Sequence, residues 1–292
     1  MRVIGDSMNP ALSSGDILLV SESAYKEAEP GRFDLIVFKY KYDIHTRYIK
    51  RVIGLPGETV EIKDNTIYIN GEELKEYYKN NLLEMKNLSV REDRGKEIIE
   101  ELTGRKDAEV LIDPTMMLTA EEWDKVSKKP RKLTMDKYIL NYFLGNLSEK
   151  RRKEIEKVAT QNGCTIINLM DKNDSLYASG PSEFLYLVKN AFMICTDSYH
   201  GSIFSIIYNK PFVVFDREDN IVNMNSRLET LLSKFQLQER YSKDGKIPEE
   251  LLQCDYTESY KILELEKEKT NEYIEKILNN SNDEKNKEGS IN

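Results

Sequence analysis

The stretch AFMICTDSYHG, residues 191–201, decides the fold class of the larger part of the chain. Its first part, Ala191–Cys195, is a continuous apolar run of strand length, typical of a parallel strand buried on both faces. The run Gly201–Tyr208 has the apolar spacing of a helix. A buried strand followed by a helix is half of a βαβ unit, so this stretch predicts an α/β domain with a parallel sheet.

The same alternation continues on both sides of that stretch. Strands are predicted at Leu88–Arg91, Glu109–Ile112, Lys137–Leu144, Thr165–Met170 and Pro211–Phe215. Helices are predicted at Asp93–Thr103, Ala120–Ser127, Ser148–Asn162, Ser182–Lys189, Ser226–Phe235 and Tyr260–Leu278. We therefore expect an α/β, Rossmann-like parallel-sheet domain over residues 81–278. The polar residues 279–292 are expected to form a disordered tail.

Residues 1–80 have a different pattern, with short β-branched or aromatic runs separated by Gly, Pro and Asp. These runs predict strands at Asp16–Ser21, Asp34–Lys41, Arg47–Leu55, Thr59–Lys63 and Thr66–Ile69. The pair Asn70-Gly71 tolerates positive φ, as a tight turn requires. We expect a small α+β domain built on antiparallel strands, with a helix-prone join over residues 72–86 and a domain boundary near residue 80.

Composition and charge exclude several classes of protein. The chain has 43 Lys and Arg against 51 Asp and Glu, a formal net charge of −8, which opposes binding to nucleic-acid phosphates. The cysteines Cys164, Cys195 and Cys254 lack CxxC spacing, so no metal site and no resident cofactor are expected. No run reaches the roughly 18 apolar residues of a membrane span, and there is no signal peptide. The chain as written is expected in the cytoplasm, or at a membrane if an anchor precedes it.

Ser7 and Lys50 form the first candidate site. Ser7 lies in a turn led by Gly5, and Lys50 lies within an otherwise apolar strand. A serine hydroxyl becomes a good nucleophile when a neutral lysine accepts its proton, and burial lowers the pKa of a lysine. The alternation of Tyr48, Lys50 and Val52 is compatible with such burial. The backbone N–H of Ser7 could also donate to a tetrahedral oxyanion.

The segments GDSMNP (5–10), RYIKRVIGLPGE (47–58), VEI (60–62) and IYINGE (67–72) closely resemble bacterial type I signal peptidases. The resemblance covers roughly residues 2–75. It implies a serine endopeptidase that cleaves secretory preproteins after small residues, with Ser7 as nucleophile and Lys50 as general base. The family's later Gly-Asp-Asn-Arg box is not found, so an incomplete version of the signal-peptidase β fold is expected.

His200 marks the second candidate site. It follows the strand Ala191–Thr196, where open α/β sheets bind ligands, and it begins a helix whose free N–H groups favour an anion. Its side chain suits proton transfer or anion binding near neutral pH. Gly201 and Ser202 are expected to let the backbone approach a phosphate or carboxylate. A structural role as a helix-cap histidine is the alternative.

Residues 86–278 resemble the C-terminal half of polysaccharide pyruvyl transferases. The matching pieces are LSVRE (88–92), DPT (113–115), LT (118–119), EW (122–123), GPSEF (180–184), TDSYHG (196–201), FS (204–205) and NKPF (209–212). The resemblance implies one lobe of a glycosyltransferase-B-like fold, phosphoenolpyruvate as substrate and a sugar or polysaccharide acceptor. His200, within the loop that contains Ser198 and Gly201, would be an acid or phosphate-binding residue, and Arg91 an anion contact.

Three functions remain open from the sequence. The first is a signal-peptidase-like endopeptidase module fused to a pyruvyl-transferase-like domain. The second is pyruvyl transfer from phosphoenolpyruvate to a cell-surface polysaccharide sugar. The third is an inactive chimeric or truncated product.

Overall fold

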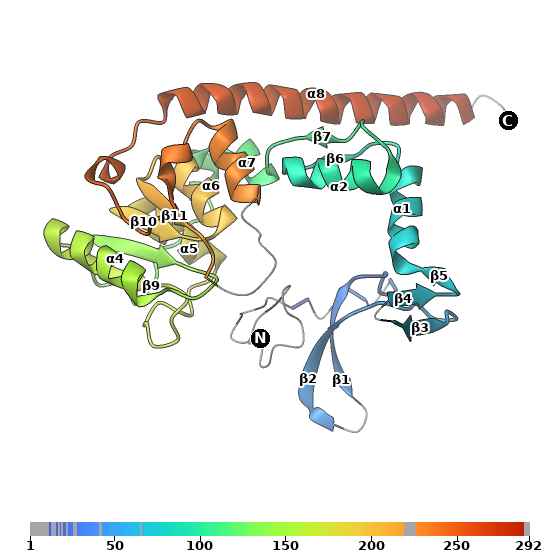
Figure 1. Ribbon diagram of the computed structural model, residues 1–292, viewed down its shortest axis with the longest axis horizontal. Helices are drawn as coiled ribbons and strands as arrows, with labels where there is room; N and C mark the ends of the chain where they lie inside the picture. Colours follow the sequence, from blue (N-terminus) through green and yellow to red (C-terminus); the bar gives the residue numbers. More distant parts are fainter. Residues whose placement is uncertain are drawn as a thin grey trace. The chain divides into compact units, whose positions relative to one another are not determined.

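The computed structural model describes residues 12, 16, 18, 20, 21, 23–25, 28–40, 43–64, 66–218 and 226–288 (Figure 1). It divides the chain into two compact units, residues 1–86 (unit 1) and residues 87–292 (unit 2). The division falls after Lys86, within the join where a boundary was expected near residue 80. Each unit is described by itself.

Unit 1 contains short antiparallel strands. Its strands are β1 (Leu35–Tyr40), β2 (Asp43–Arg51), β3 (Val60–Lys63), β4 (Thr66–Ile69) and β5 (Glu72–Glu73), followed by helix α1 (Leu74–Glu84). β1 pairs with β2, and a second sheet has the order β3-β4-β5. Of the predicted strand at 16–21, the structure describes residues 16, 18, 20 and 21, all outside any strand.

The turn predicted from Asn70-Gly71 is confirmed. Asn70 has φ +53° and Gly71 has φ +86°, and the two residues connect β4 to β5. Asn70 also fixes the start of β3, because its Oδ1 accepts a hydrogen bond from the N–H of Thr59 at 2.9 Å. One asparagine therefore joins the start of β3 to the end of β4 at the open end of the hairpin.

Arg32 fixes the loop that follows β2. Its guanidinium donates to the carbonyl of Ile53 and forms an ion pair with Glu58. Glu58 in turn accepts a hydrogen bond from the N–H of Leu55 at 2.6 Å. The Arg32 side chain is only 5% exposed, so its buried charge is paired with that of Glu58. The strand that carries Lys50 thus leads into a loop held by one buried arginine.

Unit 2 is built on a five-stranded sheet in which every pair of neighbours is parallel. Its strands are β8 (Tyr138–Tyr142), β9 (Thr165–Asn168), β10 (Met193–Thr196), β11 (Phe212–Phe215) and β12 (Tyr241–Ser242). The order is β12-β11-β10-β8-β9, so the first strand of the sheet, β8, lies between β9 and β10. This order is that of a doubly wound sheet, and the predicted parallel sheet is confirmed.

Helices cover both faces of this sheet. They are α4 (Glu149–Asn162), α5 (Pro181–Asn190), α6 (Tyr199–Ile207) and α7 (Ser226–Lys234). Successive strand residues point to opposite faces, so Ile139 packs with the α4 residue Ile155, whereas Leu140 packs with Leu187 and Ile203 of α5 and α6. The sheet is therefore the middle of three layers.

The remaining elements of unit 2 lie beside this core. They are β6 (Ser89–Val90), α2 (Asp93–Thr103), β7 (Glu109–Val110), the 3-10 helices η1 (Pro114–Met117), η2 (Gln238–Arg240) and η3 (Glu249–Leu252), α3 (Ala120–Asp124) and α8 (Thr257–Glu288). β6 and β7 pair in parallel only with each other. The predicted β-α-β unit over these residues is confirmed, with its two parallel strands forming a separate sheet beside the five-stranded one.

Helix α8 is longer than predicted and continues to Glu288. The sequence between residues 279 and 288 contains neither Gly nor Pro, and Gly289 is the first residue of either kind after it. A polar segment without these residues has nothing that ends a helix already started by packing. Most of the expected disordered tail, residues 279–288, is therefore helical.

Candidate functional site

Lys50 lies near the end of β2, with Ile36 of β1 as its Cα partner. Residues that alternate along the ribbon share a face, so Lys50 lies on the face of Tyr48, whose ring is 6.1 Å from that of Phe38. Lys39 and Arg47 pair across the two strands on the opposite face. Ser7, the predicted nucleophile, lies outside the described residues.

The side chain of Lys50 is exposed, whereas those of Tyr48 and Val52 are half-buried. The expected burial of this lysine in an apolar environment is therefore not found. The physical reason is that β1 and β2 form a sheet of only two strands, and alternation along one strand does not supply a layer that covers its face.

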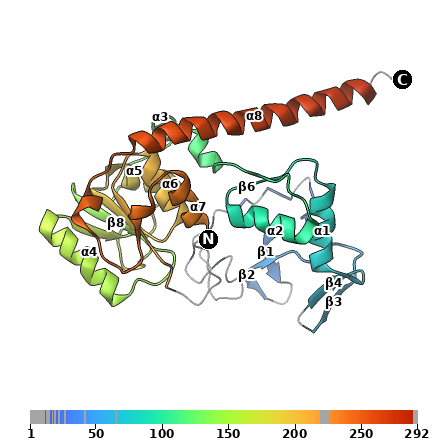
Figure 2. The same ribbon diagram turned by 45° about the horizontal axis from the view of Figure 1, so that its top comes forward.

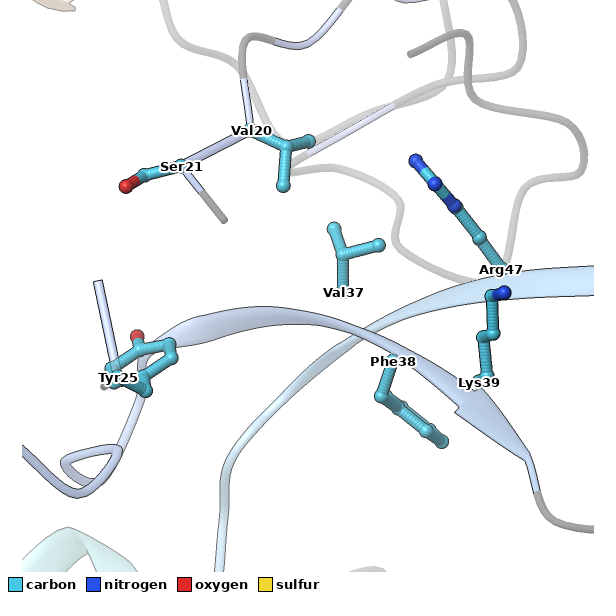
Figure 3. Close-up of a pocket in the computed structure, with 7 residues that line it drawn as sticks. All are labelled: Val20, Ser21, Tyr25, Val37, Phe38, Lys39 and Arg47. Carbon is cyan, nitrogen blue, oxygen red and sulfur yellow. The ribbon is translucent and has the colours of Figure 1, made fainter. Parts of the chain in front are cut away.

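A hollow of about 330 Å³ lies on the β1–β2 ribbon (Figure 3). Val20 and Val37 point toward each other across it, Lys39 and Arg47 lie at one end, and Tyr25 lies at the other. Its lining residues are Val20, Ser21, Tyr25, Val37, Phe38, Lys39 and Arg47. The hollow thus combines apolar contact from two valines with two cationic side chains at one end.

In unit 2 the candidate site lies where the strand order reverses, between β8 and β10. Leu144 and Gly145, just after β8, donate their backbone N–H groups to the carboxylate of Asp197 at 2.7 and 2.8 Å. Arg217 Nε lies 3.5 Å from Asp197 Oδ2. Burial raises the pKa of Asp197, and these donors oppose that effect. Asp197 therefore joins three loops at the carboxyl edge of the sheet, where doubly wound folds bind ligands.

Ser198 and Gly201 shape the start of α6. Ser198 is the N-cap, and its Oγ accepts a hydrogen bond from the N–H of Gly201 at 3.3 Å. A Cβ at position 201 would lie 2.6 Å from Thr196 Oγ1 and 3.3 Å from Tyr142 Cδ1. Gly201 and Ser202 are both buried. The glycine is thus required for close packing of α6 on β8 and β10, and the expected approach of a ligand to these two residues stays a prediction.

His200 is positioned by a buried carboxylate. Its Nε2 lies 3.7 Å from Oδ2 of Asp113, which also forms an ion pair with Arg91. Thr115 donates to Asp113 Oδ1 from its backbone N–H at 3.0 Å and from its hydroxyl at 2.7 Å. Burial alone would raise the pKa of Asp113, but the contacts with His200, Thr115 and Arg91 outweigh it and hold the pKa well below its usual value.

Two arginines contact the ring of Tyr199. The guanidinium carbon of Arg91 is 5.5 Å from the ring centroid, and that of Arg227 is 5.8 Å from it. Burial lowers the pKa of Arg227, and it raises the pKa of Tyr199 to about 12. A small cavity of about 80 Å³ opens here, lined by Leu144, Asp197, Ser198, Tyr199, His200, Arg217, Arg227 and Leu228. Arg217 and Arg227 contribute two positive charges to its walls against the one carboxylate of Asp197, which suits a small anion.

The structure brings together the second set of predicted residues, Arg91, Ser198, His200 and Gly201, around Tyr199 and Asp113. Sequence reasoning missed Asp113, Tyr199, Arg217 and Arg227. Asp113 and Arg217 each follow a predicted strand closely, so the strand-end rule that pointed to His200 would also have found them. The same rule applies to Tyr199, which directly precedes His200, whereas Arg227 carries no such signal.

Two searches of the described residues gave negative results. Across the described ranges, no helix is both long enough and apolar enough to span a bilayer. Within the same part of the chain, no three or more His, Cys, Asp or Glu side chains lie together as metal ligands would.

Residues 1–131 match the sequence model of the family named "Signal peptidase, peptidase S26". Signal peptidase I V of Bacillus subtilis (strain 168) is 44% identical over 75 residues, which are 26% of this chain and 44% of that protein. Signal peptidase I of Bacillus caldolyticus is 44% identical over 78 residues, 26% of this chain and 41% of that protein. Signal peptidase I of Pseudomonas aeruginosa is 40% identical over 84 residues, 24% of this chain and 30% of that protein. No solved structure matches the chain.

The N-terminal region is therefore similar to peptidase family S26. Within that family, its curated relatives are signal peptidases I. The chain spans less than half the length of these relatives. The family match extends beyond unit 1, which ends at Lys86, and reaches residue 131 in the part of unit 2 that contains α2, η1 and α3.

Proposed function

We propose that the N-terminal region is a signal-peptidase-I-like serine endopeptidase module that cleaves secretory preproteins after small residues. The observation that carries the proposal is the match of residues 1–131 to the S26 family, at 44% identity to a signal peptidase I over 75 residues. In this proposal Ser7 attacks the scissile carbonyl and Lys50 takes its proton. Water then releases the acyl-enzyme.

Because Lys50 is exposed, a bound substrate can lie directly over its side chain. A lysine accepts a proton only in its neutral form, and exclusion of water favours that form. We infer that the bound preprotein covers the Lys50 face of β2 and excludes water from it.

The hollow beside Val37 provides a place for a substrate side chain. It offers apolar contact from Val20 and Val37 and positive charge from Lys39 and Arg47. A preprotein segment that pairs along the edge of the ribbon would place alternate side chains on its two faces, because an extended chain has a period of two residues. One side chain is proposed to cover Lys50, and its neighbour to enter the hollow on the opposite face.

The test is cleavage of a purified preprotein by the full chain, with N-terminal sequencing of the product. Ser7→Ala and Lys50→Ala are expected to lower the rate by about a thousandfold or more, because each removes a member of one catalytic unit. Lys75→Ala, at an exposed position of α1, is the matched control and should keep the wild-type rate. Equal cleavage by all four proteins would refute the proposal.

A second candidate function rests on unit 2. We propose transfer of a pyruvyl group from phosphoenolpyruvate to a cell-surface polysaccharide sugar, by one lobe of a glycosyltransferase-B-like fold. The specific observation is the convergence of Arg91, Arg227 and His200 on Tyr199 at the N-terminus of α6. This arrangement suits the phosphate and carboxylate of the donor. His200 is oriented by Asp113 and would act as acid or phosphate ligand.

Release of phosphate from phosphoenolpyruvate in the presence of a sugar acceptor tests this second function. His200→Ala and Arg91→Ala should abolish acceptor-dependent release. Arg152→Ala, an exposed arginine on α4, is the matched control. Wild-type rates in both site variants would remove this site from the reaction. Absence of activity in this assay and in the preprotein assay would favour the third alternative, an inactive chimeric or truncated product.

A further inference from the structure

Strand β3 lies at one edge of its sheet, and no strand of the described part of the chain pairs with its outer side. The sheet order β3-β4-β5 places β3 at the edge, where both Figure 1 and Figure 2 show it beside β4. All residues of Val60–Lys63 are exposed, and the side chains of Ile62 and Val60 keep 73% and 46% of their surface open. An edge strand with exposed apolar side chains is a template for pairing with another strand.

The pattern of hydrogen bonds between β3 and β4 shows which residues of β3 direct their backbone N–H and C=O groups away from the sheet. The N–H of Asn70 donates to the carbonyl of Thr59 at 2.9 Å, so these two residues form a hydrogen-bonded pair at the start of the hairpin. Inward and outward residues alternate along an antiparallel strand. Glu61 and Lys63 therefore direct their backbone groups toward β4, whereas Val60 and Ile62 direct theirs away from the sheet.

We propose that β3 pairs with β3 of a second copy of this chain, antiparallel and centred on Ile62. In this register Ile62 of one copy faces Ile62 of the other, and their outward backbone groups form hydrogen bonds. Glu61 of each copy then faces Lys63 of the other, in non-hydrogen-bonded positions where side chains approach most closely. The sequence of this edge is therefore complementary in charge to itself.

Charge also selects this register over its nearest competitor. A shift of two residues keeps outward groups facing outward groups, but it places Glu61 of one copy opposite Glu61 of the other. Like charges directly opposite each other destabilise a strand pair. The centred register has two opposite-charge pairs instead and is compatible with twofold symmetry, in which each copy contributes the same patch. The product is one continuous sheet, β5-β4-β3 followed by β3-β4-β5 of the second copy.

This inference is independent of the proposed peptidase, since it uses neither Ser7 nor Lys50. The test is sedimentation velocity of the full chain from about 1 μM to about 1 mM at low salt. Wild type should shift from the mass of one chain to twice that mass as concentration rises. Salt should weaken the dimer, because the charge pairs lie at the surface.

Three variants separate charge pairing from folding. Glu61→Lys places two lysines opposite each other on both sides of Ile62 and should weaken the dimer about tenfold or more. The double variant with Glu61→Lys and Lys63→Glu reverses both charges and should restore wild-type affinity. Glu84→Lys, an exposed glutamate on α1, changes net charge equally and should leave the dimer unchanged.

Several results would overturn the proposal. One is a single-chain mass for wild type at every concentration, which would leave the edge to some other partner. Another is an unchanged dimer in Glu61→Lys. A third is a double variant that remains monomeric while its circular dichroism spectrum matches wild type. Restoration by the double variant would also exclude misfolding as the cause of the single variant's defect.

Discussion

Nε2 of His200 lies 3.7 Å from Oδ2 of Asp113, although the two residues belong to distant segments of unit 2. Asp113 is the N-cap of η1, and His200 is in the first turn of α6. The Asp113 carboxylate is 2% exposed and also binds Arg91 and Thr115. One buried carboxylate therefore fixes the orientation of the residues that form the unit 2 site.

Asp113→Asn should destabilise unit 2 by about 1–3 kcal/mol at pH 7. Contacts with His200, Thr115 and Arg91 hold the folded-state pKa of Asp113 below its unfolded value of about 3.9. The carboxylate therefore stabilises the fold above about pH 5, and this contribution is lost as the pH falls toward the folded-state pKa. The free energy of unfolding of wild type should therefore exceed that of the variant by about 1 kcal/mol less at pH 3 than at pH 7.

Urea unfolding followed by the fluorescence of Trp123 measures this difference, because Trp123 is the single tryptophan of the chain and packs within unit 2. Asp107→Asn is the matched control. Asp107 forms an exposed ion pair with Arg105, and such pairs contribute about 0–1 kcal/mol. A pH-independent difference for Asp113→Asn would contradict the proposed role of its carboxylate.

Gly201→Ala should destabilise unit 2 by about 1–3 kcal/mol, because the added methyl meets Thr196 Oγ1 at 2.6 Å and Tyr142 at 3.3 Å in a packed interior. Gly180→Ala is the control, since a Cβ there has no neighbour within 4 Å. Thermal unfolding of both variants, followed by Trp123 fluorescence, checks the contrast. Equal midpoints would show that α6 has room to move away from the sheet.

Lys50→Arg should abolish preprotein cleavage while preserving the exposed positive charge on β2. A guanidinium stays protonated and cannot accept the serine proton, so the rate should fall as far as in Lys50→Ala. Preprotein binding should persist within a few fold, because the charge and the strand remain. Cleavage kinetics and a binding titration on the same protein separate the two effects. Substantial activity in Lys50→Arg would mean that the residue only positions the substrate.

Arg32→Met should loosen the loop after β2, since it removes the ion pair with Glu58 and the hydrogen bond to the Ile53 carbonyl. Glu58, whose side chain is 18% exposed, then lacks its charged partner in the loop. Faster amide exchange over residues 53–58, measured by mass spectrometry, is the expected result.

The matched control for this loop is Arg51→Met, which removes a hydrogen bond from an exposed arginine to the Phe33 carbonyl. Its effect on exchange should be small, because water replaces an exposed hydrogen bond. Equal exchange in both variants would contradict the role assigned to Arg32.

Local periodicity was sufficient to predict much of unit 2. The run Ala191–Cys195 is apolar at every position, because the strand Met193–Thr196 is buried on both faces. A short apolar run bounded by turns is a strong strand signal. Helix Asp93–Thr103 has the predicted bounds, since its apolar positions follow the helical period and Gly104 ends it with φ +74°.

Contacts between distant segments were beyond the sequence patterns. The pairing of β6 only with β7 depends on which backbone groups meet in space, and strands of two residues have no measurable period. The Asp113–His200 contact likewise depends on which distant segments meet in space. The exposure of Lys50 shows a further limit, since alternation along a strand identifies a face without showing what covers it.

Helix α8 links parts of unit 2 that lie far apart along the chain (Figure 2). Its Leu263 belongs to the main core, and further along Lys269 donates to the carbonyl of Val110 in β7 at 3.0 Å. Because α8 follows every other described element, a ribosome has made all of them before this contact can form. The contact between α8 and β7 therefore forms only after the rest of the described chain has been made, and β7 lacks it while the chain is still growing.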